Sequence, residues 1–435
     1  MARIGIRRED KSDWEARVPL VPADVARLAK SEGIGFTVER SPIRAFGEEA
    51  YAEAGASIAD DLGGCPIILG VKEIPPERFE EGKTYVFFSH VIKGQPENMG
   101  MLRRLMSLGC TLIDYEKVTD ESGRRLVFFG RFAGMAGMID TLWALGRRLR
   151  QEGIDNDFER IQPAHHYRDL EHVRHELAAV SAFIRSRGLP GALRPFVVGF
   201  TGYGKVSQGA QEMYDLLPTE AIEPEELATV PAAAKSCYKV VFDEAHMVRR
   251  SDGSSAFELG EYYEHPERYE AAFFPYVKHL TALVNCIYWE PRYPKFITQE
   301  QFRELYGKGQ PRLRVVGDIT CDINGSLACT TRATDPVDPV YVYDPETGVT
   351  HEGISGKGPV VLAVDFLPCE IPVDASRAFS EALLPYLPAL ARADFSGALC
   401  DAGLPAELER ATIVYHGKLT EPYRYLEEFV GDAVG

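Results

Sequence analysis

Three apolar runs in the first third of the chain each end at ionisable side chains. These runs and the residues that follow them are 65–71 with Lys72 and Glu73, 84–89 with His90, and 110–115 with Glu116. Short β-branched and aromatic runs separated by helix-length polar stretches are typical of successive strands in a mostly parallel sheet. Ligands of such sheets bind outside the carboxyl ends of the strands. The pattern therefore predicts that these side chains converge on one edge as a proton-transfer site, although any one of them alone is more simply a solvated strand end.

The same patterning predicts the other elements of an α/β protein. Further strands are expected at 3–6, 35–39, 196–200, 239–242, 282–288 and 314–319. Helices are expected at 22–30, 48–54, 133–150, 169–186 and 376–390, with a turn between short strands at 341–348 and a last helix near the C-terminus. Gly33 is expected to end the first helix. The long helix at 133–150 is a natural bridge to a second domain.

A glycine-rich turn follows the predicted strand at 196–200 and precedes a helix that runs to Leu217. Gly202 permits a tight turn, and Gly204 lets backbone amides approach a pyrophosphate at the helix N-terminus. Ser207 stands where a third glycine is usual, and Gly209 lies two residues later. Strand, turn and helix in this order predict a dinucleotide site.

Acidic and polar residues at later strand ends extend this prediction. Glu223 lies 21 residues after Gly202, where a carboxylate would bind the ribose hydroxyls and disfavour a 2′-phosphate. Cys286 and Asp318 lie near the ends of two further strands and are expected to face the nicotinamide, or else to cap those strands.

Composition narrows the class of protein. A chain of 435 residues is long enough for two or three domains. Its formal charge of −17 argues against a nucleic-acid or anionic-membrane partner but not against an anionic substrate, because a local arginine cluster can override the global field.

Cysteine usage and hydropathy bear on metal sites and location. The eight cysteines lack CxxC spacing, which indicates buried thiols in a reducing compartment, and the pair His165–His166 is interpreted as structural. There is no signal-peptide pattern and no apolar run of membrane-spanning length, so a cytoplasmic location is expected.

The motifs of the chain resemble a known family. They lie at 68–73, 87–93, 113–117, 123–125, 132–137, 284–289, 317–320 and 423–426. These segments are similar to the lysine–2-oxoglutarate reductases that form saccharopine, which are related to the lysine-forming saccharopine dehydrogenases and more remotely to alanine dehydrogenase. The resemblance implies an α/β fold of two Rossmann-like doubly wound domains with a cleft between them. It assigns 1–135 plus 335–435 to a substrate domain and 136–334 to a dinucleotide-binding domain.

The resemblance also implies residue roles. Lys72 and His90 match the acid–base catalysts. The positions matching substrate contacts are Arg17, Glu73, Gln95, Glu116, Arg125, Phe129, Ile287, Tyr288 and Trp289. With the glycine-rich turn included, the expected cofactor contacts are Arg124, Gly202, Gly204, Lys205, Val206, Ser207, Glu223, Cys286, Gly317, Asp318, Ile319 and Thr320. No metal is expected.

The implied reaction interconverts lysine, 2-oxoglutarate and reduced NAD or NADP with saccharopine and the oxidised cofactor. The three carboxylates of saccharopine fit the arginines at 17, 124 and 125. In larger bifunctional enzymes a glutamate-forming saccharopine dehydrogenase follows this region, and here such an enzyme is expected as a separate protein. Reductases of the group generally use NADPH, whereas Glu223 favours NAD, so cofactor preference and physiological direction stay open.

Two other function classes remain alternatives. One is a related amino-acid or opine dehydrogenase, such as an alanine dehydrogenase; the excess of arginines argues against alanine, which has one carboxylate. The other is a non-catalytic nucleotide-binding sensor, which would not need to retain both Lys72 and His90.

Overall fold

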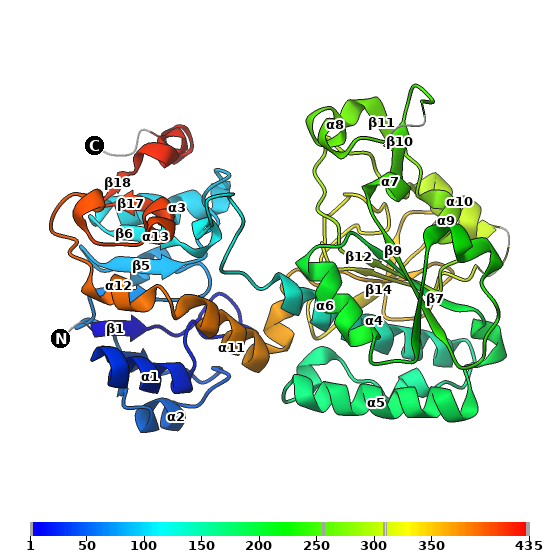
Figure 1. The fold of residues 1–435 in the computed structure, drawn as a ribbon, viewed down its shortest axis with the longest axis horizontal. Helices are drawn as coiled ribbons and strands as arrows, with labels where there is room; N and C mark the ends of the chain where they lie inside the picture. Colours follow the sequence, from blue (N-terminus) through cyan, green and yellow to red (C-terminus); the bar gives the residue numbers. More distant parts are fainter. Residues whose placement is uncertain (1–2, 255–256, 308, 310, 432–435) are drawn as a thin grey trace. The chain divides into compact units, whose positions relative to one another are not determined.

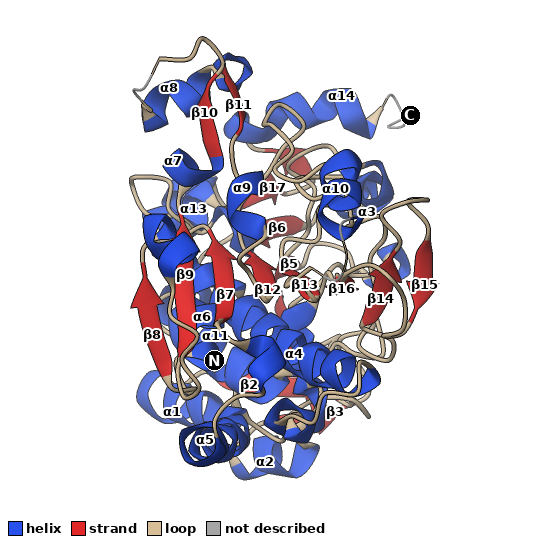
Figure 2. Cartoon of the chain, turned by 90° about the vertical axis from the view of Figure 1, so that its right-hand side faces the viewer, coloured by secondary structure: helices blue, strands red, loops and turns tan. Residues whose placement is uncertain are grey.

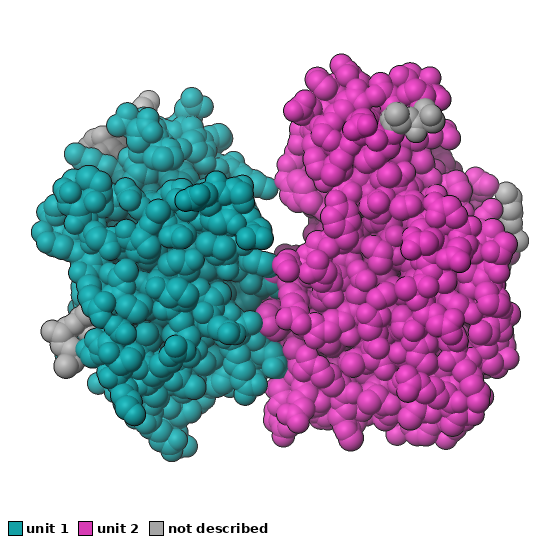
Figure 3. Space-filling view, in the orientation of Figure 1, with its two compact units in different colours: residues 1–129, 372–435 teal, residues 130–371 magenta. Residues whose placement is uncertain are grey.

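The computed structural model describes residues 3–254, 257–307, 309 and 311–431 (Figure 1). The chain divides into two compact units, coloured separately in Figure 3. Unit 1 comprises residues 1–129 and 372–435, and unit 2 comprises residues 130–371. Each unit contains one large, mostly parallel sheet with helices around it (Figure 2). The predicted α/β class is thereby confirmed.

The sheet of unit 1 has the strand order β18-β17-β6-β5-β4-β1-β2-β3. The bounds are β1 (Arg3–Ile6), β2 (Gly35–Glu39), β3 (Ser57–Ala59), β4 (Ile67–Leu69), β5 (Thr84–Phe87), β6 (Thr111–Asp114), β17 (Thr412–Tyr415) and β18 (Lys418–Leu419). Strands β1 to β6 pair in parallel, and β17 and β18 extend the sheet antiparallel. The direction of winding reverses between β1 and β4, as in a doubly wound nucleotide-binding sheet.

Helices cover this sheet: those at 22–32 and 48–53 lie where the sequence predicts, whereas the helix expected at 376–390 is two helices, 372–383 and 387–392. The helices of this unit are α1 (Pro22–Glu32), α2 (Glu48–Glu53), α3 (Pro96–Ser107), α11 (Pro372–Leu383), α12 (Leu387–Arg392), α13 (Ala406–Arg410) and α14 (Glu427–Val430), with 3₁₀ turns η1 (Pro76–Arg78), η2 (Tyr115–Lys117), η9 (Leu399–Asp401) and η10 (Glu421–Leu426). Helix α1 starts with proline, whose fixed φ suits the first turn, and Gly33 ends it with a φ of 67°. The helix expected near the C-terminus is formed by η10 and the short α14.

The sheet of unit 2 has the order β15-β14-β16-β13-β12-β7-β9-β8. The bounds are β7 (Phe196–Thr201), β8 (Thr219–Ile222), β9 (Cys237–Phe242), β12 (Ala282–Asn285), β13 (Val315–Asp318), β14 (Val340–Tyr343), β15 (Thr350–Glu352) and β16 (Val360–Leu362), and a separate hairpin is formed by β10 (Val248–Arg250) and β11 (Tyr269–Ala271). The strands from β8 to β16 in this order run parallel, whereas β14 and β15 are antiparallel.

The helices of unit 2 surround this second sheet. They are α4 (Gly130–Gln151), α5 (Leu170–Arg187), α6 (Lys205–Tyr214), α7 (Glu244–Met247), α8 (Leu259–Glu264), α9 (Phe274–Val277) and α10 (Gln299–Gly307), with 3₁₀ turns η3 (Asp157–Arg160), η4 (Ala164–His166), η5 (Gly191–Leu193), η6 (Pro224–Thr229), η7 (Pro266–Arg268) and η8 (Leu367–Glu370).

Residues 335–371 do not join unit 1, which corrects the expected extent of the substrate domain. Strand β16 pairs in parallel with β13, and β14 pairs with β16, so this segment completes the sheet of unit 2. Residues 130–135 also lie in unit 2, because α4 begins at Gly130.

Close packing of α4 on α6 explains the small residues at the start of the long helix. A Cβ atom on Gly134 would lie 1.9 Å from the carbonyl oxygen of Val206, and one on Gly209 would lie 2.0 Å from that of Arg131. Only glycine permits this approach of two helix backbones. Gly209 therefore serves helix packing, which the usual third glycine of the motif also does.

Further observations concern membrane spanning, metal binding, the cysteines and the histidine pair. Among the described residues, no helix combines the length and apolarity needed to cross a bilayer, and no cluster of His, Cys, Asp and Glu could hold a metal ion. The cysteines are free thiols, mostly buried, but Cys400 is exposed. His165 contacts the buried Glu370, with Nδ1 3.2 Å from Oε2.

Replacing Gly134 with alanine is expected to destabilise unit 2 by about 1–3 kcal/mol, because the added methyl group requires α4 and α6 to separate. Urea unfolding followed by circular dichroism measures this change. Gly260→Ala in α8 is the matched control, since no atom lies within 4 Å of a Cβ at that position. Equal stability of the two variants would contradict the packing argument.

Candidate active site

The predicted acid–base residues lie at the carboxyl ends of neighbouring parallel strands of unit 1. Lys72 and Glu73 follow β4, His90 follows β5, and Glu116 follows β6 in the turn η2. The local sequence sets this arrangement, because each strand is an apolar run that stops at a polar residue. These four positions therefore share one edge of the sheet, as the spacing predicted.

His90 and Glu73 form a direct pair. The Nδ1 atom of His90 lies 2.7 Å from Oε1 of Glu73. The backbone of His90 has a φ of 48°, a left-handed conformation that is uncommon for residues other than glycine. Asn98 in α3 donates its side-chain amide to the carbonyl of His90 at 3.1 Å, and the ring of Phe88 stacks on the imidazole. The histidine is thus held in one orientation from its backbone and from its ring.

The Glu73 carboxylate is a stable anion. Burial acts to raise its pKa, but the hydrogen bond to His90 and the charges of His90 and Lys72 outweigh burial and lower the pKa to about 2. Lys11 adds an ion pair at 3.9 Å. The ionised carboxylate is therefore placed to hold the imidazole of His90 in position.

The predicted arginines differ in their surroundings. Arg17 is buried, and its Nε and Nη2 atoms donate to the two carboxylate oxygens of Glu15 at 2.7 and 2.5 Å. Its guanidinium also lies over the ring of Phe129, 4.2 Å from the centroid. Arg125 is exposed and pairs with Glu116.

Two other predicted residues of unit 1, Arg124 and Gln95, have hydrogen-bond partners of their own. Arg124 is exposed and pairs with Asp120, with 3.0 Å between Nε and Oδ2. Gln95 precedes α3 and accepts a hydrogen bond from the backbone of Lys93 at 3.0 Å. The structure thus pairs His90 with Glu73 and leaves both Arg124 and Arg125 exposed, each beside its own carboxylate partner.

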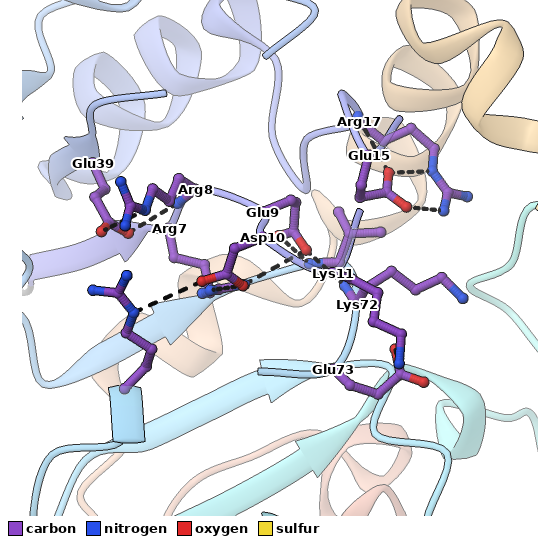
Figure 4. Close-up of polar contacts among 12 residues, drawn as sticks. Arg7, Arg8, Glu9, Asp10, Lys11, Glu15, Arg17, Glu39, Lys72 and Glu73 are labelled. Atoms are coloured by element: carbon purple, nitrogen blue, oxygen red, sulfur yellow. Dashed lines mark hydrogen bonds and ion pairs between the residues drawn. The ribbon is translucent and has the colours of Figure 1, made fainter. Parts of the chain in front are cut away.

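Two buried carboxylates below this edge were missed by the sequence interpretation. Glu9, just after β1, accepts backbone hydrogen bonds from Val71 and Lys72 (Figure 4). Asp114, the last residue of β6, accepts from the backbone and the hydroxyl of Ser89. Burial raises the pKa of Glu9 to about 7 and that of Asp114 to about 6. Glu9 lies three residues after β1 and Asp114 is the last residue of β6, so the position of each near a strand end was a usable signal.

In unit 2 a pocket of about 340 Å³ lies at the carboxyl ends of β7, β9 and β12. Its lining residues are Gly202, Tyr203, Gly204, Glu244, Tyr262, Tyr263, Cys286, Ile287, Tyr288 and Tyr293. The winding of this sheet reverses at β7, and the crevice at such a reversal is where doubly wound sheets bind ligands.

The glycine-rich turn has the geometry expected of a phosphate-binding turn. Gly202 has a φ of 77°, which favours glycine, and Gly204 is the residue before α6. A Cβ on Gly204 would meet no atom within 4 Å, so its backbone borders open space at the N-terminus of α6. Lys205, Val206 and Ser207 form the first turn of that helix, with Ser207 buried.

Glu223 is not among the residues that line this pocket. The strand next to β7 is β9, and β8, which precedes Glu223, lies outside β9 at the sheet edge. Glu223 is exposed, and its side chain caps η6. Glu244, two residues after β9, lines the pocket instead, and the Tyr263 hydroxyl donates to its Oε1 at 2.8 Å.

Asp318 is the centre of a buried hydrogen-bond network. Its carboxylate accepts from the side chains of Asn285, Thr320 and Thr330 at 2.8, 2.8 and 2.5 Å. Asn285 also accepts from Thr201 at 2.6 Å. These contacts join the ends of β7, β12 and β13, so the structure gives Asp318 the strand-capping place that was the alternative at the sequence level.

The remaining predicted residues of unit 2 surround this network. Cys286 and Ile287 are buried in the pocket wall, Tyr288 is exposed, and the indole of Trp289 donates to the carbonyl of Pro294. Gly317 packs against the side chain of Thr141 in α4, which leaves no space for a Cβ, and Ile319 covers Gly137 of the same helix. Gly317 and Ile319 therefore serve packing behind the strand end.

Comparison with known proteins agrees with the motifs and with the fold. Residues 5–136 match the family model "Alanine dehydrogenase/PNT, N-terminal domain". An alpha-aminoadipic semialdehyde synthase of Arabidopsis thaliana is 36% identical over 97% of this chain, which covers 41% of that relative. The chain thus spans less than half the length of this relative.

A second relative matches nearly from end to end. It is a "Saccharopine dehydrogenase [NAD(+), L-lysine-forming]" of Yarrowia lipolytica, 26% identical over 90% of this chain and 93% of its own. A solved L-alanine dehydrogenase shares the fold, with a TM-score of 0.61 over 98% of both chains at 17% identity. The chain is therefore similar in sequence to alpha-aminoadipic semialdehyde synthases and to a lysine-forming saccharopine dehydrogenase, and it shares the fold of an alanine dehydrogenase.

Proposed function

We propose that the chain is an NAD(P)-dependent oxidoreductase that interconverts lysine and 2-oxoglutarate with saccharopine. The observation that carries the proposal is the Glu73–His90 pair beside Lys72 at adjacent strand ends, in a chain whose homologues bear names of lysine metabolism. A cytoplasmic location remains a prediction.

Lys72 and His90 are the proposed proton carriers. The ε-amine of lysine joins the keto group of 2-oxoglutarate through a carbinolamine and an imine, and each step moves a proton. The ionised Glu73 keeps the imidazole of His90 oriented through its contact with Nδ1. Bound nicotinamide supplies or accepts the hydride.

The arginines are the proposed carboxylate binders. Arg125 is exposed and paired with Glu116, so a substrate carboxylate can replace that partner with a similar charge and geometry. Arg17, held over Phe129 by Glu15, presents a guanidinium of fixed orientation. Fixed guanidinium groups suit a substrate with several carboxylates.

The nucleotide is proposed to bind at the pocket of unit 2. The open space beside Gly204 accommodates a pyrophosphate at the N-terminus of α6. Glu244, at the end of the strand next to β7, is the candidate for the ribose hydroxyls, which favours NAD over NADP.

The protein is expected to oxidise reduced nicotinamide only when lysine and 2-oxoglutarate are both present. Absorbance of the reduced cofactor at saturating substrate measures this, with saccharopine and oxidised cofactor as the reverse assay. Equal activity with ammonia and pyruvate would instead favour an alanine dehydrogenase, and cofactor binding without turnover would favour a sensor.

Lys72→Met and His90→Gln are each expected to lower kcat by about 10²–10⁴-fold, the usual loss for one positioned acid or base. Each should also remove one limb of the pH–rate profile, whereas KM changes less. Arg125→Ala is the comparison: it should mainly raise KM for 2-oxoglutarate or saccharopine, because it supplies charge and no proton. A folded Lys72→Met variant with wild-type kcat and pH profile would remove Lys72 from the mechanism.

Glu244→Gln is expected to lower the preference for NADH over NADPH, measured as the ratio of their kcat/KM values, by roughly tenfold, about 1.4 kcal/mol. The reason is that a carboxylate that repels a 2′-phosphate becomes neutral. Glu223→Gln is the control and should leave the ratio unchanged. The opposite pattern, with the shift in Glu223→Gln alone, would restore the original ribose assignment.

A further inference from the structure

The turn that carries Lys72 is held from a neighbouring strand by one side chain. The Oε1 atom of Glu9 accepts the backbone N–H of Val71 at 2.8 Å, and Oε2 accepts that of Lys72 at 3.0 Å. Both carboxylate oxygens are thus used on consecutive amides, as Figure 4 shows. From the other side, the carbonyl of Val71 accepts from the N–H of Phe88 at 3.0 Å.

The packing around Glu9 leaves it little freedom. The residue is buried, and a Cβ on Gly70 would lie 3.0 Å from Cδ of Arg7 and 3.4 Å from Oε1 of Glu9. The Nη1 atom of Arg7 lies 3.6 Å from Oε2 of Glu9 and balances its charge. Such burial of a carboxylate is costly unless charge and hydrogen bonds compensate it, so the contact to the Lys72 turn is an integral part of this site.

We propose that Glu9 is a positioning residue for the acid–base reaction: its carboxylate fixes the backbone of Val71 and Lys72 and thereby the place from which the Lys72 amine reaches the substrate. The proposal rests on the proposed function of Lys72. Glu9 lies where the winding of the unit 1 sheet reverses, between the ends of β1 and β4, so it joins the two loops that border that crevice.

The protonation state of Glu9 connects this role to pH. Burial raises its pKa to about 7, against the opposing effects of Arg7 and the two amides. The other titratable groups that act on it electrostatically are Glu15, Arg44 and Tyr115. As the pH falls through about 7, a protonated carboxyl loses its charge-assisted acceptance of the amides, and the turn loosens.

Glu9→Gln tests the proposal in the full-length protein. Glutamine has nearly the same shape but offers one acceptor oxygen and one N–H₂ group, so one of the two amides loses its acceptor. Hydrogen–deuterium exchange in residues 70–74 should rise at least tenfold. With lysine and 2-oxoglutarate, kcat should fall by about 10²-fold, the scale of a 1 Å misplacement, while KM for NADH stays within twofold. The acid limb of the kcat profile should become shallower.

Glu39→Gln is the matched control. Glu39 ends β2, and its Oε2 accepts the backbone N–H of Arg8 at 3.0 Å, a bond of the same kind on the same sheet that does not touch the Lys72 turn. This variant should keep the wild-type exchange in residues 70–74 and the wild-type kcat.

Wild-type exchange and kcat in Glu9→Gln, or an equal loss in Glu39→Gln, would overturn the proposal. If Glu9→Gln does not fold, Glu9→Asp, which keeps the charge on a shorter side chain, is measured in the same way and should give an intermediate loss. If the wild-type protein shows no turnover with these substrates, the proposed function fails, and the exchange measurement still decides whether Glu9 holds the turn.

Discussion

Backbone N–H groups just beyond the carboxyl ends of parallel strands no longer donate to a neighbouring strand. In this protein, buried carboxylates accept hydrogen bonds from such groups. Glu9 binds the amide of Lys72, and Asp114 binds that of Ser89. In unit 2, Asp318 accepts the backbone N–H of Cys321 at 3.3 Å, and Asn285 connects it to Thr201 at the end of β7. A buried backbone N–H needs an acceptor, so the position of the carboxylate fixes the conformation of the turn that carries the N–H. The candidate catalytic edge of unit 1 and the pocket edge of unit 2 are thus both ordered by buried carboxylates.

The sequence contained enough information for most single elements but little for their pairing. The unit β1-α1-β2 could be predicted because Pro22 and Gly33 mark the start and the end of its helix and the whole unit lies within 40 residues of chain. The pairing of β16 with β13 could not, since the segment 335–371 has short strands and turns that fit either sheet. Choice of partner depends on burial against distant strands, which local periodicity does not encode.

The site shows the same division between local and distant information. Lys72 and His90 were predicted as site residues because each follows an apolar run. Glu9 also follows a strand, but it stands in a run of charged residues that looks solvated, and only the packing of β1 against β4 buries it. Glu223 was predicted by counting along the chain, whereas Glu244 became a candidate only from the fold, because β9 rather than β8 pairs with β7 and Glu244 follows β9.

The long helix α4 connects the two halves of the chemistry along the chain. Phe129, which lies under Arg17 and stacks on Phe379, is followed directly by Gly130, the first residue of α4. One turn later Gly134 packs against Val206 in the first turn of α6, the helix whose N-terminus the proposed pyrophosphate would meet. Because this contact is between backbones, it cannot be relaxed by a side-chain rotamer, so the glycine-rich turn keeps a fixed place on α4. The small residues of this helix are therefore as necessary to a dinucleotide site as the glycines of the turn itself.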